Sequence, residues 1–226
     1  MPPDLSVALR LIAITDDLRD GRDGLVARAC AAVRGGATMV QLRLKHADAR
    51  TLADVARALV RTISVPVLVN DRADVALASG AAGTHVGTDD LSVAALRRIV
   101  PAGFLIGVSV GSEPEAATAR GADYAGIGPL YGSASKLDAG VAIGVGGFAR
   151  LAAAAGLPAV AIGGISAVTA GAAIAAGAAG IAVIAAVFGR DDPERAAREL
   201  RTQIDAAFVA RALPRSPPAT APSPAG

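Results

Sequence analysis

The 226-residue chain has the length of one α/β barrel domain, and its 22 basic and 20 acidic residues leave a net charge of only +2. Apolar residues make up 53% of the chain, yet Gly, Arg or Asp interrupts each apolar run before it is long enough to cross a bilayer. The basic residues are scattered and aromatic residues make up only 3% of the chain, which argues against a nucleic-acid surface. The single cysteine, Cys30, excludes an internal disulfide.

Runs rich in Val and Ile alternate with helical patterns along the chain. These runs predict buried strands at residues 10–15, 39–45, 66–71, 84–87, 105–110, 124–130, 158–163 and 180–184. Helices are expected at residues 24–34, 48–63, 73–79, 92–100, 113–120, 147–155, 167–176 and 193–212. Eight strand–helix units with short connections predict an α/β fold, a (β/α)8 TIM barrel, as one domain over residues 1–213. A doubly wound open sheet would alternate in the same way, but no Gly-x-Gly-x-x-Gly turn follows the first strand.

The two ends of the chain carry separate signals. Residues 214–226 are rich in Pro, Ser and Ala, a composition typical of a disordered tail. The first residues show no basic segment followed by an apolar one, so we expect no export signal and a cytoplasmic location.

Cations alternate with apolar residues in the second predicted strand. Alternate residues of a strand share a face, so Gln41, Arg43 and Lys45 are expected to point into the barrel. Leu42 and Leu44 then point toward the surrounding helices.

Carboxylates follow the next two predicted strands. Val67, Val69 and Asp71 are expected to share a face, with Asp71 at the carboxyl end of its strand, where barrel active sites lie. Asp89 and Asp90 follow the fourth strand, so one could ligate a metal while the other caps the next helix. Cations and carboxylates at neighbouring strand ends suit a polyanion that is held through a divalent metal.

Small residues on the later strands predict a cavity. Gly107 and Ser109 alternate on the fifth strand, and Gly126 and Gly128 on the sixth, which leaves space for a ligand. We interpret His85 as a packed strand residue rather than a metal ligand, because no second histidine or cysteine accompanies it.

Two loops predict phosphate binding. The loop after the sixth strand carries two hydroxyls and an ammonium, on Ser133, Ser135 and Lys136. The loops after the seventh and eighth strands, near Gly164 and Ile184, are the usual phosphate site of such barrels, where backbone N–H groups at a helix start face the anion.

Taken together, these segments resemble the thiamine phosphate synthase family over about residues 11–208. The matching segments are Gln-Leu-Arg-Leu-Lys at 41–45, Asn-Asp-Arg at 70–72, His-Val-Gly-Thr-Asp-Asp at 85–90, Gly-Val-Ser at 107–109, Gly-Ala-Asp-Tyr at 121–124, Gly-Pro-Leu-Tyr at 128–131, Lys136 and Ala-Ile-Gly-Gly-Ile at 161–165. The resemblance implies a transferase that joins 4-amino-2-methyl-5-(diphosphomethyl)pyrimidine to a thiazole phosphate. Pyrophosphate leaves through a dissociative course with a pyrimidine-methyl cation, and thiamine phosphate forms.

The resemblance also implies roles for individual residues. It assigns the pyrimidine diphosphate to Gln41, Arg43, Lys45, Asn70, Ser109 and Lys136, with Arg43, Lys45, Ser109 and Lys136 as the catalytic groups. It assigns the cofactor Mg²⁺ to Asp71 and Asp90, and the thiazole phosphate to Ser133, Ser135, Gly164, Ile184 and Ala185. The expected partners are therefore small-molecule substrates, with no nucleic acid and no membrane; the oligomeric state, a homo-oligomer included, is left open.

The chain departs from the family pattern at several positions. Leu44 stands where an acidic residue is usual, Ser133 and Ser135 where threonines are usual, Gly111 where histidine is frequent, and Ala82 and Ala179 where Asp is common. Two other functions remain open on the same barrel: a thiazole tautomerase-like paralogue and a non-catalytic barrel that binds a phosphorylated ligand. Retention of the predicted diphosphate and metal residues argues against the tautomerase, as does the absence of a histidine at position 111.

Overall fold

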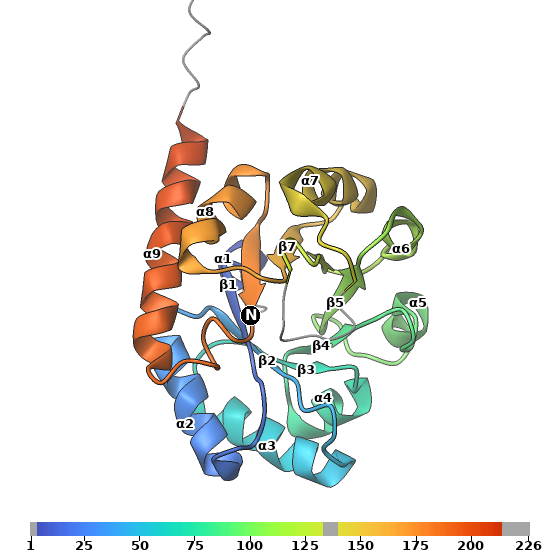
Figure 1. Ribbon diagram of the computed structural model, residues 1–226. Helices are drawn as coiled ribbons and strands as arrows, with labels where there is room; N and C mark the ends of the chain where they lie inside the picture. The colour runs from blue at the N-terminus through green and yellow to red at the C-terminus, as the bar shows by residue number, and fades with distance from the viewer. Residues whose placement is uncertain (1–3, 133–139, 214–226) are drawn as a thin grey trace, which may run out of the picture.

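Eight parallel strands close into a barrel that is ringed by helices (Figure 1). The structure, a computed structural model, describes residues 4–132 and 140–213. The strands are β1 (Leu11–Ile14), β2 (Met39–Leu42), β3 (Val67–Asn70), β4 (Gly83–Val86), β5 (Leu105–Val110), β6 (Tyr124–Ile127), β7 (Ala159–Ile162) and β8 (Gly180–Val183). Each strand pairs with its neighbours in chain order, and β1 pairs with β8 in the register Ile12 to Ala182. This closure confirms the predicted (β/α)8 barrel and excludes the open sheet.

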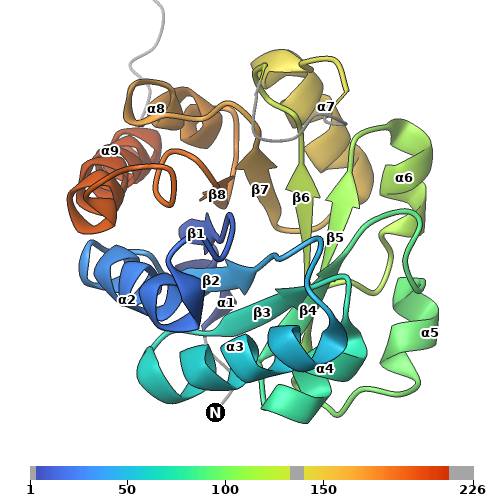
Figure 2. The ribbon, with the colours of Figure 1, turned by 60° about the horizontal axis from the view of Figure 1, so that its bottom comes forward.

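Apart from the first, the helices follow the strands and cover the outside of the barrel, as Figure 2 shows from a second direction. They are α1 (Leu5–Ala8), α2 (Gly21–Arg34), α3 (Ala49–Thr62), α4 (Ala73–Ser79), α5 (Val93–Arg97), α6 (Glu113–Thr118), α7 (Gly144–Ala155), α8 (Ala167–Ala175) and α9 (Pro193–Ala212). In the described ranges, no helix combines the length and the apolarity that crossing a bilayer requires. The predicted tail, residues 214–226, lies outside the described residues.

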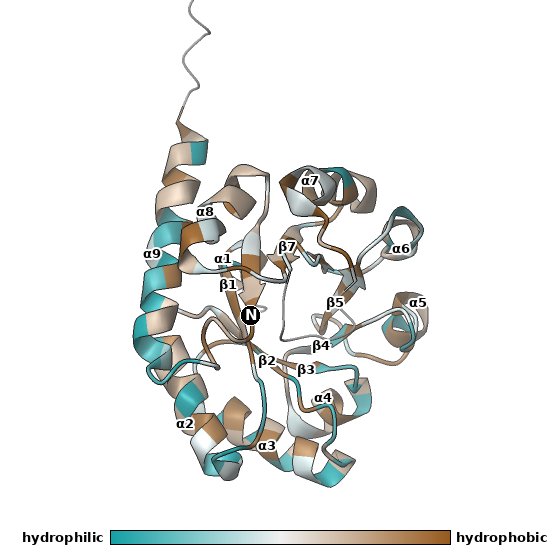
Figure 3. Cartoon of the chain, viewed as in Figure 1, coloured by the Kyte–Doolittle hydropathy of each residue, from teal (hydrophilic) through white to brown (hydrophobic). Residues whose placement is uncertain are grey.

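The buried residues of α3 and α9 recur on one face of each helix. In α3 the buried residues Leu52, Val55, Ala56 and Leu59 recur at the spacing that places them on one face. The long helix α9 packs against α2 and α8, and in Figure 3 it carries alternating hydrophilic and hydrophobic stretches. The amphipathic pattern therefore determines which side of each helix faces the barrel.

The apolar core has two parts, one outside and one inside the barrel wall. Alternation along β1 separates them: Leu11 and Ala13 pack in the outer cluster, between strands and helices, whereas Ile12 and Ile14 pack in the inner cluster. Tyr124 belongs to the inner cluster and is fully buried there. The inner cluster fills the barrel toward the amino ends of its strands and leaves the carboxyl end for polar side chains.

One helical turn that the sequence pattern does not predict closes the amino end of the barrel. Helix α1 begins after Asp4, whose carboxylate accepts a hydrogen bond of 2.9 Å from the Ser6 N–H. Ala8 and Leu9 continue from this turn into the inner cluster, and a Cβ added at Gly180 would overlap the Leu9 carbonyl oxygen. The short Asp-x-Ser capping pattern is the only local signal for this turn, because four residues are too few to show a helical period.

Candidate active site

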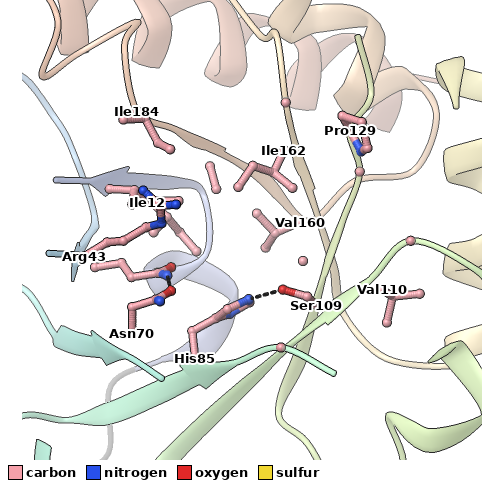
Figure 4. Close-up of a pocket in the computed structure, with 18 of the residues that line it drawn as sticks. Ile12, Arg43, Asn70, His85, Ser109, Val110, Pro129, Val160, Ile162 and Ile184 are labelled. Atoms are coloured by element: carbon pink, nitrogen blue, oxygen red, sulfur yellow. Dashed lines mark hydrogen bonds between the residues drawn. The ribbon is translucent and has the colours of Figure 1, made fainter. Parts of the chain in front are cut away.

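A cavity of about 650 Å³ opens at the carboxyl end of the barrel (Figure 4). This volume lies in the range of small-molecule sites. Ten of the predicted site residues line it: Gln41, Arg43, Lys45, Asn70, Asp71, Asp90, Ser109, Gly164, Ile184 and Ala185. Three others, Ser133, Ser135 and Lys136, lie outside the described residues. In Figure 4 the polar side chains of Arg43, Asn70, His85 and Ser109 face the apolar side chains of Ile162 and Ile184.

The alternation predicted at the end of β2 is confirmed. Gln41, Arg43 and Lys45 line the cavity, while Leu42 and Leu44 pack in or against the outer cluster. The outward position of Leu44 explains how this chain accommodates an apolar residue where the family that it resembles usually has an acidic one.

Strand β2 is shorter than predicted, and a side chain from the segment after β1 continues its pairing. The strand ends at Leu42, and the next residue, Arg43, is held by the buried Thr15. The Arg43 N–H donates to the Thr15 hydroxyl at 2.9 Å, and that hydroxyl donates to the Arg43 carbonyl at 3.2 Å. Because both backbone groups of Arg43 are bound, its side chain enters the cavity from a fixed point.

A side-chain amide pair connects β2 to β3. The buried Gln41 donates from Nε2 to Oδ1 of Asn70 at 2.6 Å. The bond fixes the direction of the Asn70 amide at the cavity wall and keeps the two predicted diphosphate residues together.

The predicted facing of β3 is wrong, although Asp71 does reach the cavity. Val67 and Val69 pack in the outer cluster, and it is Asn70 that faces inward. Asp71 lines the cavity because the chain turns there: its φ of 64° is left-handed, a conformation that Asp tolerates better than most residues. Its N–H still donates to the His85 carbonyl at 2.8 Å, so the turn stays attached to β4.

Asp90 lies beside Asp71 and changes its titration. One Asp90 carboxylate oxygen accepts a 2.8 Å hydrogen bond from the Gly87 N–H, which fixes the side chain. Partial desolvation and the neighbouring Asp90 carboxylate raise the pKa of Asp71 from 3.8 to about 6, while Arg43 and Lys45 act in the opposite direction. The two carboxylates therefore repel each other at neutral pH.

Neither aspartate after β4 caps the next helix, contrary to the expectation. Ser92 is the capping residue of α5, and its hydroxyl accepts a 3.3 Å hydrogen bond from the Ala95 N–H. Asp89 and Asp90 both line the cavity instead. The serine directly before the helical period is the stronger capping signal.

The neighbouring carboxylates Asp71 and Asp90 fit a magnesium ion. Carboxylate oxygens are the ligands that Mg²⁺ prefers, and a divalent cation would relieve the repulsion that raises the pKa of Asp71. Across the described residues, no group of three or more His, Cys, Asp or Glu side chains could hold a metal alone. Two protein carboxylates are what a Mg²⁺ ion needs when substrate phosphate oxygens and water supply its other ligands.

His85 lines the cavity, where the sequence interpretation has it only as a packed strand residue. Its Nδ1 lies 3.0 Å from the Tyr124 hydroxyl, and its Nε2 lies 3.1 Å from the Ser109 hydroxyl (Figure 4). The signal is present in the alternation along β4, since Val86 packs in the outer cluster and its neighbour must therefore face inward.

The inward glycines of β5 and β6 make room for aromatic rings rather than only for a ligand. A Cβ at Gly107 would overlap the Tyr124 ring and hydroxyl, and one at Gly126 would lie 3.0 Å from Cε1 of His85. Burial raises the pKa of Tyr124, so its hydroxyl stays protonated. The two rings form the floor of the cavity at its junction with the inner cluster.

The far wall is built from backbone at the start of α8. Gly163 and Gly164 have φ values of 97° and 63°, and a Cβ at Gly164 would lie 2.5 Å from the Gly132 carbonyl oxygen. Only glycine fits here, because the loops after β6 and β7 touch through their backbones. Across the described residues of this wall, the loop after β8 contributes Ile184, Ala185 and Ala186.

Comparisons with known proteins identify the family of the chain. The family described as "Thiamine monophosphate synthase" matches residues 11–187. A thiamine-phosphate synthase from Azorhizobium caulinodans is 45% identical over 209 residues, which are 90% of this chain and 97% of that protein. One from Methanoculleus marisnigri is 50% identical over 182 residues, which are 78% of this chain and 86% of that protein.

A solved structure gives the same result. The thiamine phosphate pyrophosphorylase from Pyrococcus furiosus superposes with a TM-score of 0.81 at 36% identity, covering 91% of this chain and all of that one. A 3-hexulose-6-phosphate synthase, with a TM-score of 0.68 at 20% identity, shares the fold alone. The match across the barrel, together with the cations and carboxylates gathered in its cavity, shows that the chain belongs to the thiamine monophosphate synthase family.

Proposed function

We propose that this cavity joins 4-amino-2-methyl-5-(diphosphomethyl)pyrimidine to a thiazole phosphate and releases pyrophosphate. The observation that carries the proposal is the carboxylate pair, Asp71 and Asp90, beside Arg43 and Lys45 in one cavity. Isolated carboxylates would bind a cation, and isolated guanidinium groups would bind an anion. Their combination suits a metal-bound diphosphate.

In the proposed reaction, the carbon–oxygen bond between the pyrimidine methylene and the diphosphate breaks, and its electron pair leaves with pyrophosphate. The thiazole nitrogen then donates its lone pair to the methylene carbon, forming the carbon–nitrogen bond of thiamine phosphate. No side-chain nucleophile takes part. The positive charges of Arg43 and Lys45 stabilise the negative charge that grows on the departing pyrophosphate.

The polar residues that the sequence predicts for the site each have a place in this scheme. Gln41 and Asn70 orient the pyrimidine diphosphate, Ser109 binds it from β5, and Asp71 and Asp90 would hold Mg²⁺. When bound, Mg²⁺ would neutralise diphosphate charge and so make pyrophosphate a better leaving group. Gly164, Ile184 and Ala185 bind the thiazole phosphate across the cavity. Three residues of the scheme lie outside the described residues. Lys136 is proposed to bind the pyrimidine diphosphate, and Ser133 and Ser135 the thiazole phosphate.

The test is product formation by the purified protein given both substrates, with Mg²⁺ and with EDTA. The expected result is thiamine phosphate together with an equal amount of pyrophosphate, in the presence of Mg²⁺ only. A folded protein that binds both substrates and forms no thiamine phosphate would overturn the proposal.

A further inference from the structure

The loop after β8 links the cavity to the core in one tight turn. Ile184 and Ala185 line the cavity, whereas Val187 and Phe188 are fully buried. The N–H groups of Val187 and Phe188 both donate to the Ile184 carbonyl, at 3.1 and 2.9 Å. Because one carbonyl binds both amides, the position of Phe188 determines where Ile184 and Ala185 stand.

Two arginines from the first strand–helix unit hold the far end of this turn. The Phe188 carbonyl accepts from Nη2 of Arg19 at 2.7 Å and lies 3.4 Å from its second donor, Nη1 of Arg28. The Arg28 guanidinium also lies 5.8 Å from the centre of the Phe188 ring. The turn after β8 is thus fixed from the neighbouring unit, at the seam where β1 closes on β8.

Asp16 joins the two arginines. Its carboxylate lies 2.8 Å from Nη1 of Arg19 and 2.9 Å from Nη1 of Arg28. The Arg28 side chain is 11% exposed and the Asp16 side chain 18% exposed, so water screens this pair less than it screens a surface pair. Arg28 also donates to the Asp17 carbonyl at 3.0 Å. Removing Arg28 would leave Asp16 paired with Arg19 alone and would take one hydrogen-bond donor and the ring contact away from Phe188, so the loop would have to shift.

None of these residues contacts the cavity. Asp16, Arg19, Arg28 and Phe188 are all absent from its lining, so they cannot touch a substrate within it. Arg28 acts on the site through the turn that begins with Ile184 and Ala185, because it binds the Phe188 carbonyl. Asp16 also follows Thr15, which holds Arg43 in the opposite wall, so Arg28 is the cleaner residue to change. Backbone N–H groups bind a phosphate well only when they are held in place. Contacts that fix the loop after β8 from its buried side therefore affect phosphate binding.

We propose that the Asp16–Arg28 pair is a positioning element for the loop after β8 and sets the affinity for the thiazole phosphate. The inference deepens the proposed function and rests on its assignment of that loop. The inference predicts different effects on the two substrates. The Asp16–Arg28 pair supports the wall that binds the thiazole phosphate, whereas the opposite wall, from β2 and β3, is fixed by other hydrogen bonds.

The experiment compares Arg28→Gln with Arg34→Gln. Arg34 lies on the same helix, α2, but its 2.8 Å ion pair is with Glu194 on α9, away from the loop. The dissociation constant of 4-methyl-5-(2-phosphooxyethyl)thiazole is measured by calorimetry, and KM for each substrate and kcat are measured with Mg²⁺. Arg28→Gln is expected to raise the thiazole phosphate dissociation constant and KM roughly tenfold, with the KM for the pyrimidine diphosphate unchanged. Arg34→Gln is expected to change neither.

A conservative variant and a second perturbation complete the test. Arg28→Lys keeps the charge and one donor and is expected to recover most of the affinity. If Arg28→Gln fails to fold, Asp16→Asn removes the charge of the other partner with almost no change in side-chain shape. It is expected to weaken binding of the thiazole phosphate in the same way. Unchanged thiazole phosphate binding in a folded Arg28→Gln or Asp16→Asn protein, or an equal rise of both KM values, overturns the inference.

The wild-type protein separates this failure from that of the proposed function. A wild type that binds the thiazole phosphate but forms no product contradicts the proposed reaction, while the ratio of dissociation constants still decides the role of Arg28. A wild type that does not bind the thiazole phosphate overturns both.

Discussion

Replacing Asp71 by Asn tests whether the carboxylate pair is held at an energetic cost. A pKa raised from 3.8 to about 6 corresponds to ~3 kcal/mol of destabilisation once the group is ionised in the folded protein. Because part of the Asp71 side chain is exposed, solvent screening reduces this figure to about 1 kcal/mol. Asn also tolerates the φ of 64° at this position, so the substitution adds no backbone strain.

The sign of the effect depends on pH. A group whose pKa is raised by folding favours the folded state fully below pH 3.8, and this contribution is lost as the pH rises through about 6. Asp71→Asn carries no charge at any pH and keeps it. The variant is therefore expected to be about 1 kcal/mol more stable than the wild type at pH 8 and equally stable near pH 3.5.

Urea denaturation in EDTA at the two pH values measures this difference. Asp74→Asn is the matched control, because hydrogen bonds from Arg72 lower the pKa of Asp74 and its neutralisation is expected to reduce stability at pH 8. With Mg²⁺ and pyrophosphate added, the wild type is expected to gain stability and Asp71→Asn to gain much less. An Asp71→Asn protein that is less stable than the wild type at pH 8 in EDTA would refute the carboxylate repulsion.

Two further substitutions test how the cavity is built. Thr15→Val removes the hydroxyl that binds Arg43. It is expected to lower the free energy of unfolding, measured in urea, by about 1–3 kcal/mol and to raise the KM for the pyrimidine diphosphate. Thr15→Ser should restore both values, and a Thr15→Val protein with the wild-type KM would contradict this role. Gly107→Ala places a methyl group against the Tyr124 ring and is expected to lower the free energy of unfolding by about 1–3 kcal/mol. The control is Gly146→Ala, at a helical site with open space, which should be neutral or stabilising. Equal stabilities of the two variants would show that the Tyr124 ring can move aside at little cost.

The barrel is predictable from the sequence because its signals are periodic and repeated. Eight apolar runs and their helices are all present, and the alternation at Gln41, Arg43 and Lys45 correctly predicts which side chains enter the cavity. A period of two residues requires only that the backbone remain extended, and the Thr15 hydroxyl keeps it so beyond the end of β2.

The facing of β3 is predicted wrongly because the backbone leaves that period at Asp71. Asp71 reaches the cavity through a left-handed turn. Alternation along β3 therefore predicts wrongly that Val67 and Val69 share its face. The interpretation of His85 rests on the absence of other metal ligands rather than on its strand face. Its contacts with Tyr124 and Ser109 depend on three strands meeting, which no local pattern records.

The turn α1 at the amino end of the barrel has a kinetic consequence. Since Ala8 and Leu9 pack into the inner cluster from below, both substrates and both products pass through the mouth at the carboxyl end. A ring seated on the floor formed by Tyr124 and His85 is covered by whatever binds above it. We therefore expect binding and release through one entrance to follow a compulsory order, in which the deepest ligand arrives first and departs last.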